Sequence, residues 1–343
     1  MTFDRFLPAE WYPQSLVQLT WPDDSTDWKD LLDEVLPCYA SLCKEIAARQ
    51  PLLIVANNQD EVIPWLAEAN RNNITIVEMP VNDTWARDHG FITVMEHNTP
   101  VLMDFKFNGW GLKFAADKDN LINGTLFKKG LFSQAVNYEN HLNLVLEGGS
   151  IESDGEGTIL TTSECLLSPN RNGAYSQEQI ELELKKLFSA KKILWLDHGF
   201  LQGDDTDSHI DTLARLAPGN RILYVKCDDP NDVHFRALSE MEKQLATFTS
   251  AQEVPYTLVP LPMCTPVYDG WERLPATYAN FLFINGAVLV PVYGLPEDKP
   301  ALDVFRKEFP DLDVVGINCL PLIKQHGSLH CVTMQFPVGV FNL

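Results

Sequence analysis

Four short stretches of this sequence hold residue types that can do acid, base or nucleophilic chemistry. They contain Asp88, Glu147, the pair His209 and Asp211, and Cys331. A thiol, a histidine that moves protons and carboxylates that orient both histidine and substrate make up the residue set of cysteine catalysis. The histidine and the carboxylates are also metal ligands, so metal-assisted hydrolysis is a second interpretation.

Cys331 follows a polar, glycine-containing segment and opens the apolar, β-branched run 331–336. The pattern predicts that a loop enters a buried strand at Cys331, where the backbone can hold a thiol rigidly. The alternative is that Cys331 is only a small buried hydrophobic residue, as most single cysteines are.

Asp88 and Glu147 each precede a segment that we expect to be a strand. Asp88 alone can be explained as a turn cap or a partner of arginine. Glu147 follows an apolar run and is followed by Gly148 and Gly149, which permit close backbone approach beside a carboxylate. Because a buried carboxylate needs partners, we expect a histidine or an arginine against Glu147.

His209 and Asp211 end an acidic stretch that also contains Asp204, Asp205 and Asp207. A solvated loop would explain the first three carboxylates, but it does not explain why His-x-Asp continues into an apolar run. In a strand, residues two apart share one face, so His209 and Asp211 are predicted to point the same way.

Other catalytic signatures are missing. His326, His330 and Cys331 lack the second cysteine pair or the HExxH motif of a zinc site, and there is no glycine-rich phosphate loop or GxSxG elbow. The thiol chemistry requires no metal and no cofactor. We therefore interpret His326 and His330 as structural or pocket-lining residues.

The elements that must position these residues form a repeat. Strand, turn and returning strand recur from near residues 88, 147, 209, 278 and 330, with stretches at helical spacing around 117–135, 177–189, 231–247 and 301–309. A repeat of roughly 60 residues indicates units arranged around a centre, where the first residues of each unit converge. The prediction is one α/β domain over residues 1–343.

The N-terminal part alternates strands and helices as well. Apolar runs at 16–21, 52–55 and 74–77 predict strands, and helical spacing predicts helices over 27–49 and 59–72. Pro37 is a possible break in the first of these helices.

Composition limits the kinds of binding partner that we expect. The formal net charge of −21 argues against nucleic acid and suits a small cationic substrate. The sequence contains no run of about 18 apolar residues, so no membrane span is predicted. No signal peptide is apparent. The 7 cysteines are scattered, which indicates reduced thiols and a cytoplasmic protein. A homo-oligomer is compatible with these features, and the sequence leaves the oligomeric state open.

Five ordered motifs carry a resemblance to a known family. They read NDTWARD at 82–88, FNGW at 107–110, LEGGS at 146–150, DDTDSHID at 204–211 and GSLHC at 327–331. Together they resemble the agmatine deiminases, which belong to the bacterial-type peptidylarginine deiminase family in the guanidine-modifying superfamily. The resemblance spans residues 16–336 and implies a five-fold pseudosymmetric α/β propeller of the pentein type.

The resemblance also implies roles for the catalytic residues. Cys331 matches the nucleophile and His209 the general acid/base. Asp88 and Asp211 match the carboxylates that grip the guanidinium. Glu147 matches the carboxylate that contacts histidine and substrate, and a hydrogen bond that it accepts from the imidazole would raise the pKa of His209.

The same motifs imply how substrate binds. Asp205 matches an acidic position near the distal amine of the substrate, although glutamate is common there. Trp85 and Trp110 match motifs that flank the pocket, and the segment 108–123 is a candidate to close over it. The residues 325–328 depart from the glycine-rich run with asparagine that many relatives have.

The implied reaction is hydrolysis of agmatine to N-carbamoylputrescine and ammonia, in polyamine synthesis. The runner-up substrates are free arginine and peptidyl-arginine. A metal-dependent hydrolase and a non-catalytic polyamine-binding protein are the alternatives from other classes; turnover would distinguish an enzyme from a binding protein.

Overall fold

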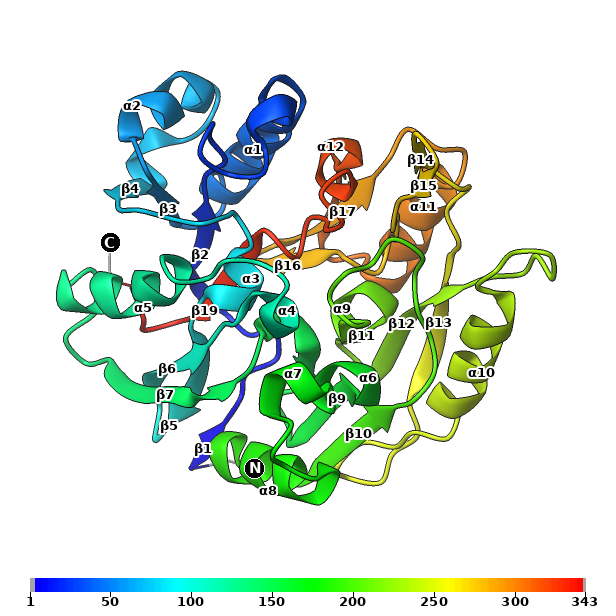
Figure 1. The fold of residues 1–343 in the computed structure, drawn as a ribbon. Helices are drawn as coiled ribbons and strands as arrows, with labels where there is room; N and C mark the ends of the chain where they lie inside the picture. Colours follow the sequence, from blue (N-terminus) through cyan, green and yellow to red (C-terminus); the bar gives the residue numbers. More distant parts are fainter. Residues whose placement is uncertain (1–3, 342–343) are drawn as a thin grey trace.

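A computed structural model describes residues 4–341, and its ribbon shows sheets arranged around a centre (Figure 1). In this range the strands form five sheets of three or four strands and one two-stranded hairpin. The short helices α3 (Ala86–His89), α4 (Gly109–Leu112) and α9 (Ile210–Leu213) lie toward the centre of the ring, and longer helices lie on its outside (Figure 1). The predicted α/β propeller is therefore confirmed.

Four units share one strand pattern. An antiparallel hairpin is joined by a third strand that runs parallel to the second strand of the hairpin. The strands are β5 Ile92–Glu96, β6 Thr99–Lys106 and β7 Asn137–Val145; β8 Ile151–Ser153, β9 Thr158–Thr162 and β10 Lys192–Leu196; β11 Ala214–Ala217, β12 Arg221–Lys226 and β13 Thr257–Pro262; and β16 Leu282–Ile284, β17 Ala287–Val292 and β18 Asp313–Asn318.

A parallel pair needs a crossover connection, and here helices provide it. The long ones are α5 Asp119–Lys128, α8 Gln177–Phe188, α10 Phe235–Leu245 and α11 Asp298–Glu308. The first three lie within predicted helical stretches, and α11 begins before its predicted stretch and overlaps most of it. In α10, Leu238, Met241 and Leu245 are buried at helical spacing, so one face packs on the sheet and the other meets solvent.

The fifth unit joins the two ends of the chain. The C-terminal strand β19 (Thr333–Pro337) pairs antiparallel with β2 (Gln14–Thr20), and β3 (Leu52–Ala56) and β4 (Ile74–Glu78) follow in parallel. The expectation of a local hairpin near residue 330 is wrong about the partner. A pairing across some three hundred residues leaves no turn signal in the sequence, whereas a hairpin does.

The N-terminal helices differ from expectation. The first is α1 (Leu32–Ala47), preceded by η1 (Lys29–Leu31), and Pro37 lies inside α1 without ending it. The predicted helix over 59–72 is broken into α2 (Gln59–Val62), η2 (Ile63–Leu66) and η3 (Arg71–Asn73). Pro64 has no backbone N–H to continue an α-helix, which explains the change to 3-10 geometry there.

Smaller elements complete the fold. They are β1 Arg5–Phe6, which pairs with β5, the hairpin strands β14 Tyr268–Asp269 and β15 Glu272–Arg273, and the turns α3 Ala86–His89, α4 Gly109–Leu112, η4 Gly148–Ser150, α6 Ser163–Leu166, α7 Pro169–Asn172, α9 Ile210–Leu213 and α12 Leu320–Ile323.

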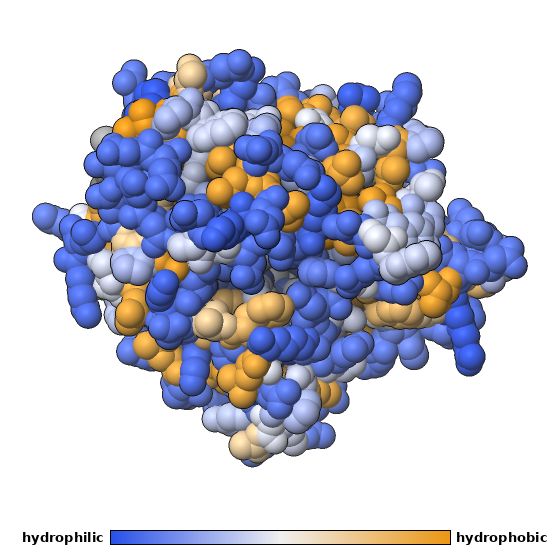
Figure 2. Space-filling view, turned by 45° about the horizontal axis from the view of Figure 1, so that its top comes forward, coloured by the Kyte–Doolittle hydropathy of each residue, from blue (hydrophilic) through white to orange (hydrophobic). Residues whose placement is uncertain are grey.

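The interior is apolar and the visible surface is largely polar. Buried apolar side chains form three clusters within the described range, the largest of which reaches from β2 to the segment before β19. Hydrophilic residues cover much of the face in Figure 2, with smaller hydrophobic patches between them. Over residues 4–341, no helix has both the length and the apolar character that crossing a membrane would need.

Candidate active site

The four predicted reactive stretches meet at the centre, but none of their key residues begins a strand. Asp88 lies in α3, Glu147 immediately precedes η4, and His209 immediately precedes α9, which contains Asp211. The prediction that His209 and Asp211 share a strand face is wrong. A helical turn advances only about 1.5 Å per residue, so it concentrates these side chains near the axis before each hairpin begins.

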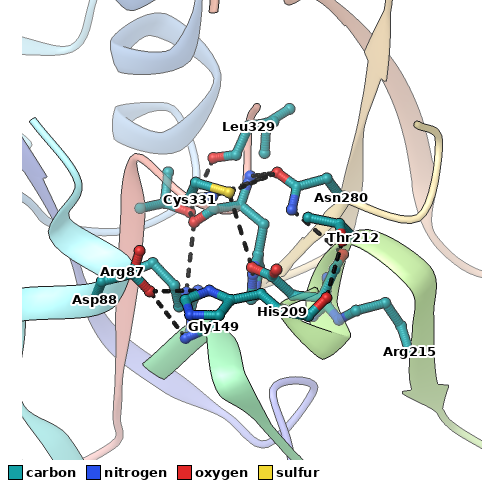
Figure 3. Close-up of polar contacts among 12 residues, drawn as sticks. Arg87, Asp88, Gly149, His209, Thr212, Arg215, Asn280, Leu329 and Cys331 are labelled. Atoms are coloured by element: carbon teal, nitrogen blue, oxygen red, sulfur yellow. Dashed lines mark hydrogen bonds and ion pairs between the residues drawn. The ribbon is translucent and has the colours of Figure 1, made fainter. Parts of the chain in front are cut away.

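Cys331 lies two residues before β19 and is buried. Its Sγ is 3.4 Å from Asn280 Oδ1 and 3.9 Å from Asp211 Oδ2. Figure 3 shows Asn280 beside the thiol, and Asp88, Gly149 and His209 grouped below it. The expected position at the entrance of a buried strand is confirmed.

Asn280 is a site residue that sequence reasoning missed. Its Oδ1 also accepts the backbone N–H of His330 at 2.9 Å, so one amide contacts both the thiol and the backbone that carries it. The signal was its place at the start of the fourth repeat, near residue 278. That start carries no charged side chain, so the sequence pattern does not mark it as reactive.

Gly149 lets the reactive groups come together. Its backbone N–H donates to Asp88 Oδ1 at 3.1 Å. A Cβ at this position would lie 2.6 Å from His209 Nδ1, 2.9 Å from Asp88 Oδ1 and 3.1 Å from Asp211 Oδ2. Close backbone approach, which the paired glycines predicted, is therefore what the site requires.

The two carboxylates at the centre have different environments. Asp88 Oδ2 accepts the Trp110 Nε1–H at 3.0 Å, yet burial, the Asp211 charge and the Glu147 charge raise the pKa of Asp88 well above its usual value. Burial acts in the same direction on Asp211, but the hydrogen bond from His330 and its charge outweigh it and lower the pKa of Asp211. One carboxyl therefore favours the protonated form and the other the ionised form.

Asp211 keeps one oxygen free. His330 Nδ1 contacts Asp211 Oδ2 at 2.7 Å, while Asp211 Oδ1 is buried and has no hydrogen-bond partner among the described residues. An unpaired buried charged oxygen costs free energy that a cationic donor would recover. This oxygen is the expected contact point for a guanidinium.

His209 is held between Asp88 and Glu147 without a hydrogen bond to either. Its Nδ1 is 3.7 Å from Asp88 Oδ1, and neither ring nitrogen has a hydrogen-bond partner within residues 4–341. Burial lowers the pKa of His209 to about 3, against the attraction of Asp211. The expectations of a Glu147–imidazole hydrogen bond and of a raised pKa for His209 are therefore both wrong.

Glu147 is instead paired with Arg171, another residue that sequence reasoning missed. Arg171 Nε donates to the two Glu147 carboxylate oxygens at 2.9 and 3.0 Å, and both side chains are fully buried. Arg171 also donates to the Thr206 carbonyl at 2.8 Å and to Asp207 Oδ2 at 2.5 Å. The expected histidine or arginine partner is an arginine, and it ties Glu147 to the loop that carries His209.

The thiol is protonated when the site is empty. Burial and the charges of Asp211 and Asp88 raise the pKa of Cys331 well above its usual value. Because His209 is neutral there, no imidazolium can stabilise the thiolate. Only a bound cation next to Asp88 and Asp211 would reverse this balance.

A cavity of about 150 Å³ leads to the thiol. Cys331 and Asp88 line it, together with the predicted binding residues Trp85, Trp110 and Asp205. The remaining lining residues are Asp27, Asp83, Phe114, Thr206, Gln325, His326 and Gly327. His326 is thus pocket-lining, as interpreted from the sequence, whereas Asp27 and Asp83 were missed.

The tryptophans form one wall of this cavity. The rings of Trp85 and Trp110 lie edge to face with centroids 6.2 Å apart. Trp85 Nε1 donates to Asp83 Oδ2 at 3.0 Å, which fixes its ring. Trp110 has a left-handed backbone with φ of 54°, an uncommon conformation outside glycine. Closure of the segment 108–123 over substrate stays a prediction.

A metal would have to compete with Arg171. Glu147, Cys165 and His209 place one possible ligand atom each within 4.8 Å of one another. The Arg171 Nε–H contacts both oxygens of Glu147, however, so a metal would compete with it for these oxygens and would be repelled by the positive charge of the guanidinium. The wider set of possible metal ligands (His209, Asp211, Glu147 and Asp88) also contains Glu147, so the same arginine opposes a metal there.

Similarity to known proteins gives the class of this protein. The family model for Porphyromonas-type peptidyl-arginine deiminase matches residues 6–337. The chain belongs to this family, which agrees with the five motifs and with the ring of sheets.

Individual relatives refine this class. The solved structure of a Porphyromonas gingivalis protein, provisionally described as an arginine deiminase, is 50% identical, covers 98% of this chain and 100% of its own, and has a TM-score of 0.95. The agmatine deiminase of C. jejuni, solved as a cysteine-to-serine variant with substrate bound, is 35% identical with 99% of each chain covered and a TM-score of 0.91. The agmatine deiminase of Stutzerimonas stutzeri is 32% identical over 97% of this chain and 95% of its own.

Proposed function

We propose that this protein is an agmatine deiminase, which hydrolyses agmatine to N-carbamoylputrescine and ammonia. The observation that carries the proposal is the charge of the cavity leading to Cys331. Its described lining contains Asp27, Asp83, Asp88 and Asp205 and neither lysine nor arginine. Agmatine is cationic at both ends and favours ionisation of these carboxyl groups as it binds, whereas arginine adds an α-carboxylate that the ionised groups would repel.

The binding roles follow from the geometry. Asp88 and Asp211 receive the guanidinium next to Cys331 by charge-assisted hydrogen bonds. Trp85 and Trp110 pack against the methylene chain. Asp205, which lines the same cavity, attracts the distal ammonium.

The first half-reaction forms a covalent adduct on Cys331. The bound guanidinium stabilises the thiolate, and neutral His209 takes the thiol proton. The sulfur attacks the guanidinium carbon, and His209 gives the proton to the leaving nitrogen, which departs as ammonia. An S-alkylthiouronium on Cys331 remains. Proton transfer of this kind contributes roughly 10²–10⁴-fold to a rate.

The second half-reaction releases the product. His209 takes a proton from a water molecule, which attacks the thiouronium carbon. The C–S bond breaks, and the leaving thiolate takes back the proton held by His209. The new hydroxyl group loses its proton to ammonia or solvent as N-carbamoylputrescine forms. Glu147 acts here through Arg171, which holds the loop of His209 in place, and no metal or other cofactor enters the balance.

The deciding experiment compares substrates. Steady-state rates with agmatine, arginine and a blocked arginine peptide are measured by detecting the ureido product. Agmatine should have the largest kcat/KM. Free arginine and peptidyl-arginine are the second candidates, because the family description and the P. gingivalis relative name arginine substrates. A higher kcat/KM for either would overturn the choice of agmatine.

Two controls test the chemistry. Cys331→Ser should bind agmatine and form no ureido product, and an adduct at Cys331 should be trapped only in the wild type. Full activity after exhaustive chelation would eliminate the metal-dependent hydrolase, and binding without any turnover would favour the polyamine-binding protein.

The cellular setting is part of the proposal. All seven cysteines are buried and free, which supports a reducing compartment and hence the cytoplasm. We infer one catalytic domain over residues 1–343, because the β19–β2 pairing needs both ends of the chain. The net charge of −21 supports a small cationic partner rather than nucleic acid. A homo-oligomer stays a prediction that light scattering would test.

A further inference from the structure

A chain of buried polar groups runs from the N-terminal segment to the carboxylate that meets the guanidinium. Glu10 Oε2 contacts His330 Nε2 at 2.5 Å, and His330 Nδ1 contacts Asp211 Oδ2 at 2.7 Å. Glu10 is 7% exposed, and His330 is 1% exposed. We propose that Glu10, acting through His330, holds Asp211 in the orientation that receives the guanidinium. Both are positioning residues, and the inference rests on the proposed function.

Both ring nitrogens of His330 are held by neighbouring groups. Nδ1 faces Asp211 Oδ2 and Nε2 faces Glu10 Oε2 at hydrogen-bond distance, and Nε2 also lies 3.0 Å from Arg215 Nη2. Burial and two arginines lower the pKa of His330 below its usual value, and the opposing effects of Glu10 and Asp211 do not offset them. The contacts at both ring nitrogens join Glu10, His330 and Asp211 into one unit in which the imidazole has a fixed position.

The far end of this unit is fixed by several elements. Arg215 in β11 donates to Glu10 Oε2 at 2.8 Å, and the backbone N–H of Phe283 in β16 donates to Glu10 Oε1 at 2.7 Å. Arg87 in α3 lies 3.6 Å from the same carboxylate. Glu10 therefore cannot rotate without breaking contacts to three units of the ring.

The near end faces the reaction. Asp211 Oδ2 contacts His330 Nδ1 and lies 3.9 Å from Cys331 Sγ. Asp211 Oδ1 has no hydrogen-bond partner among the described residues, so it is available to the substrate. His330 also precedes Cys331 in the chain, and its backbone N–H is held by Asn280. The unit thus sets the position of the carboxylate relative to the thiol.

The rival explanation is that this cluster only stabilises the ring. Glu152 provides a matched control, because it pairs with the same Arg215 and is buried in the same cluster. Among the described residues, no hydrogen bond or ion pair joins Glu152 to His330. A purely structural cluster predicts that Glu10→Gln and Glu152→Gln behave alike. The positioning unit predicts that only Glu10→Gln weakens guanidinium binding.

The test uses the full chain with Cys331→Ser, so that agmatine binds without turnover. Calorimetry should give a Kd about 10–100-fold higher when Glu10→Gln is added, as expected for a weakened charge-assisted contact, and less than threefold higher with Glu152→Gln. With Cys331 restored, Glu10→Gln should raise KM more than it lowers kcat. His330→Gln in the same background is the second variant if Glu10→Gln does not fold.

The outcomes separate the two proposals. Equal Kd values for Glu10→Gln and its parent, or equal effects of Glu10→Gln and Glu152→Gln, would overturn the positioning role. Absence of agmatine turnover in the wild type would refute the proposed function instead. The affinity for a guanidinium ligand would still report on Asp211.

Discussion

Replacing Gly149 by alanine tests whether the reactive groups must be packed this closely. The added methyl group would lie 2.6 Å from His209 Nδ1 and 2.9 Å from Asp88 Oδ1. Ordinary contacts of a Cβ begin near 3.4 Å, so the imidazole has to retreat by about 0.8 Å. The backbone of Gly149 is outside the left-handed region, so alanine adds crowding without dihedral strain.

The magnitude follows from this displacement. A misplacement of about 1 Å in a catalytic group costs on the order of 10²-fold in rate. We therefore expect kcat/KM for agmatine to fall about 100-fold in Gly149→Ala, equivalent to about 2.7 kcal/mol of transition-state stabilisation. Overpacking should also cost about 1–3 kcal/mol of unfolding free energy.

The assay combines ureido-product kinetics with denaturant unfolding. The matched control is Gly124→Ala in α5, where a Cβ would meet nothing within 4 Å. Alanine in a helix interior should stabilise that variant by about 1 kcal/mol and leave kcat/KM unchanged. The two variants make the same chemical change at a crowded and at an open position.

One result would refute the reasoning. If Gly149→Ala folds and keeps more than half of the wild-type kcat/KM, His209 and Asp88 need not occupy the described positions during catalysis. A loss of activity that appears equally in Gly124→Ala would point to a general effect of glycine replacement instead.

Three further predictions concern charge in the site. The raised pKa of Asp88 means that this carboxyl group holds a proton, which competes with the guanidinium. Agmatine binding should therefore release protons, and its affinity should increase as pH rises toward that pKa. Calorimetry in buffers of different ionisation enthalpy measures the proton release. Arg171→Leu should cost about 3–5 kcal/mol of unfolding free energy by leaving Glu147 buried and unpaired, and denaturant unfolding that matches the wild type would contradict it. Asp205→Asn should raise KM for agmatine about tenfold at similar kcat and leave KM for arginine nearly unchanged, as steady-state kinetics would show.

Local sequence determined much of this protein. Alternating apolar runs and turn residues specify the hairpins, because strand periodicity and turn chemistry act over a few residues. Their recurrence indicates the ring, and the position of Cys331 before an apolar strand indicates a rigid thiol. The glycines after Glu147 signalled close approach, since only a missing Cβ admits His209 beside Gly149.

Tertiary structure decided which groups meet and how they ionise. Arg171 and Glu10 carry no local signal of a site, and Asn280 is marked only by its place in the repeat. The ring nevertheless brings them against Glu147, the imidazole of His330 and Cys331. The ionisation of His209 likewise depends on burial and on charges from other units. Such contacts join residues far apart in the chain, and electrostatic effects grow as solvent is excluded. A sequence pattern reports neighbours along the chain, whereas these properties depend on neighbours in space.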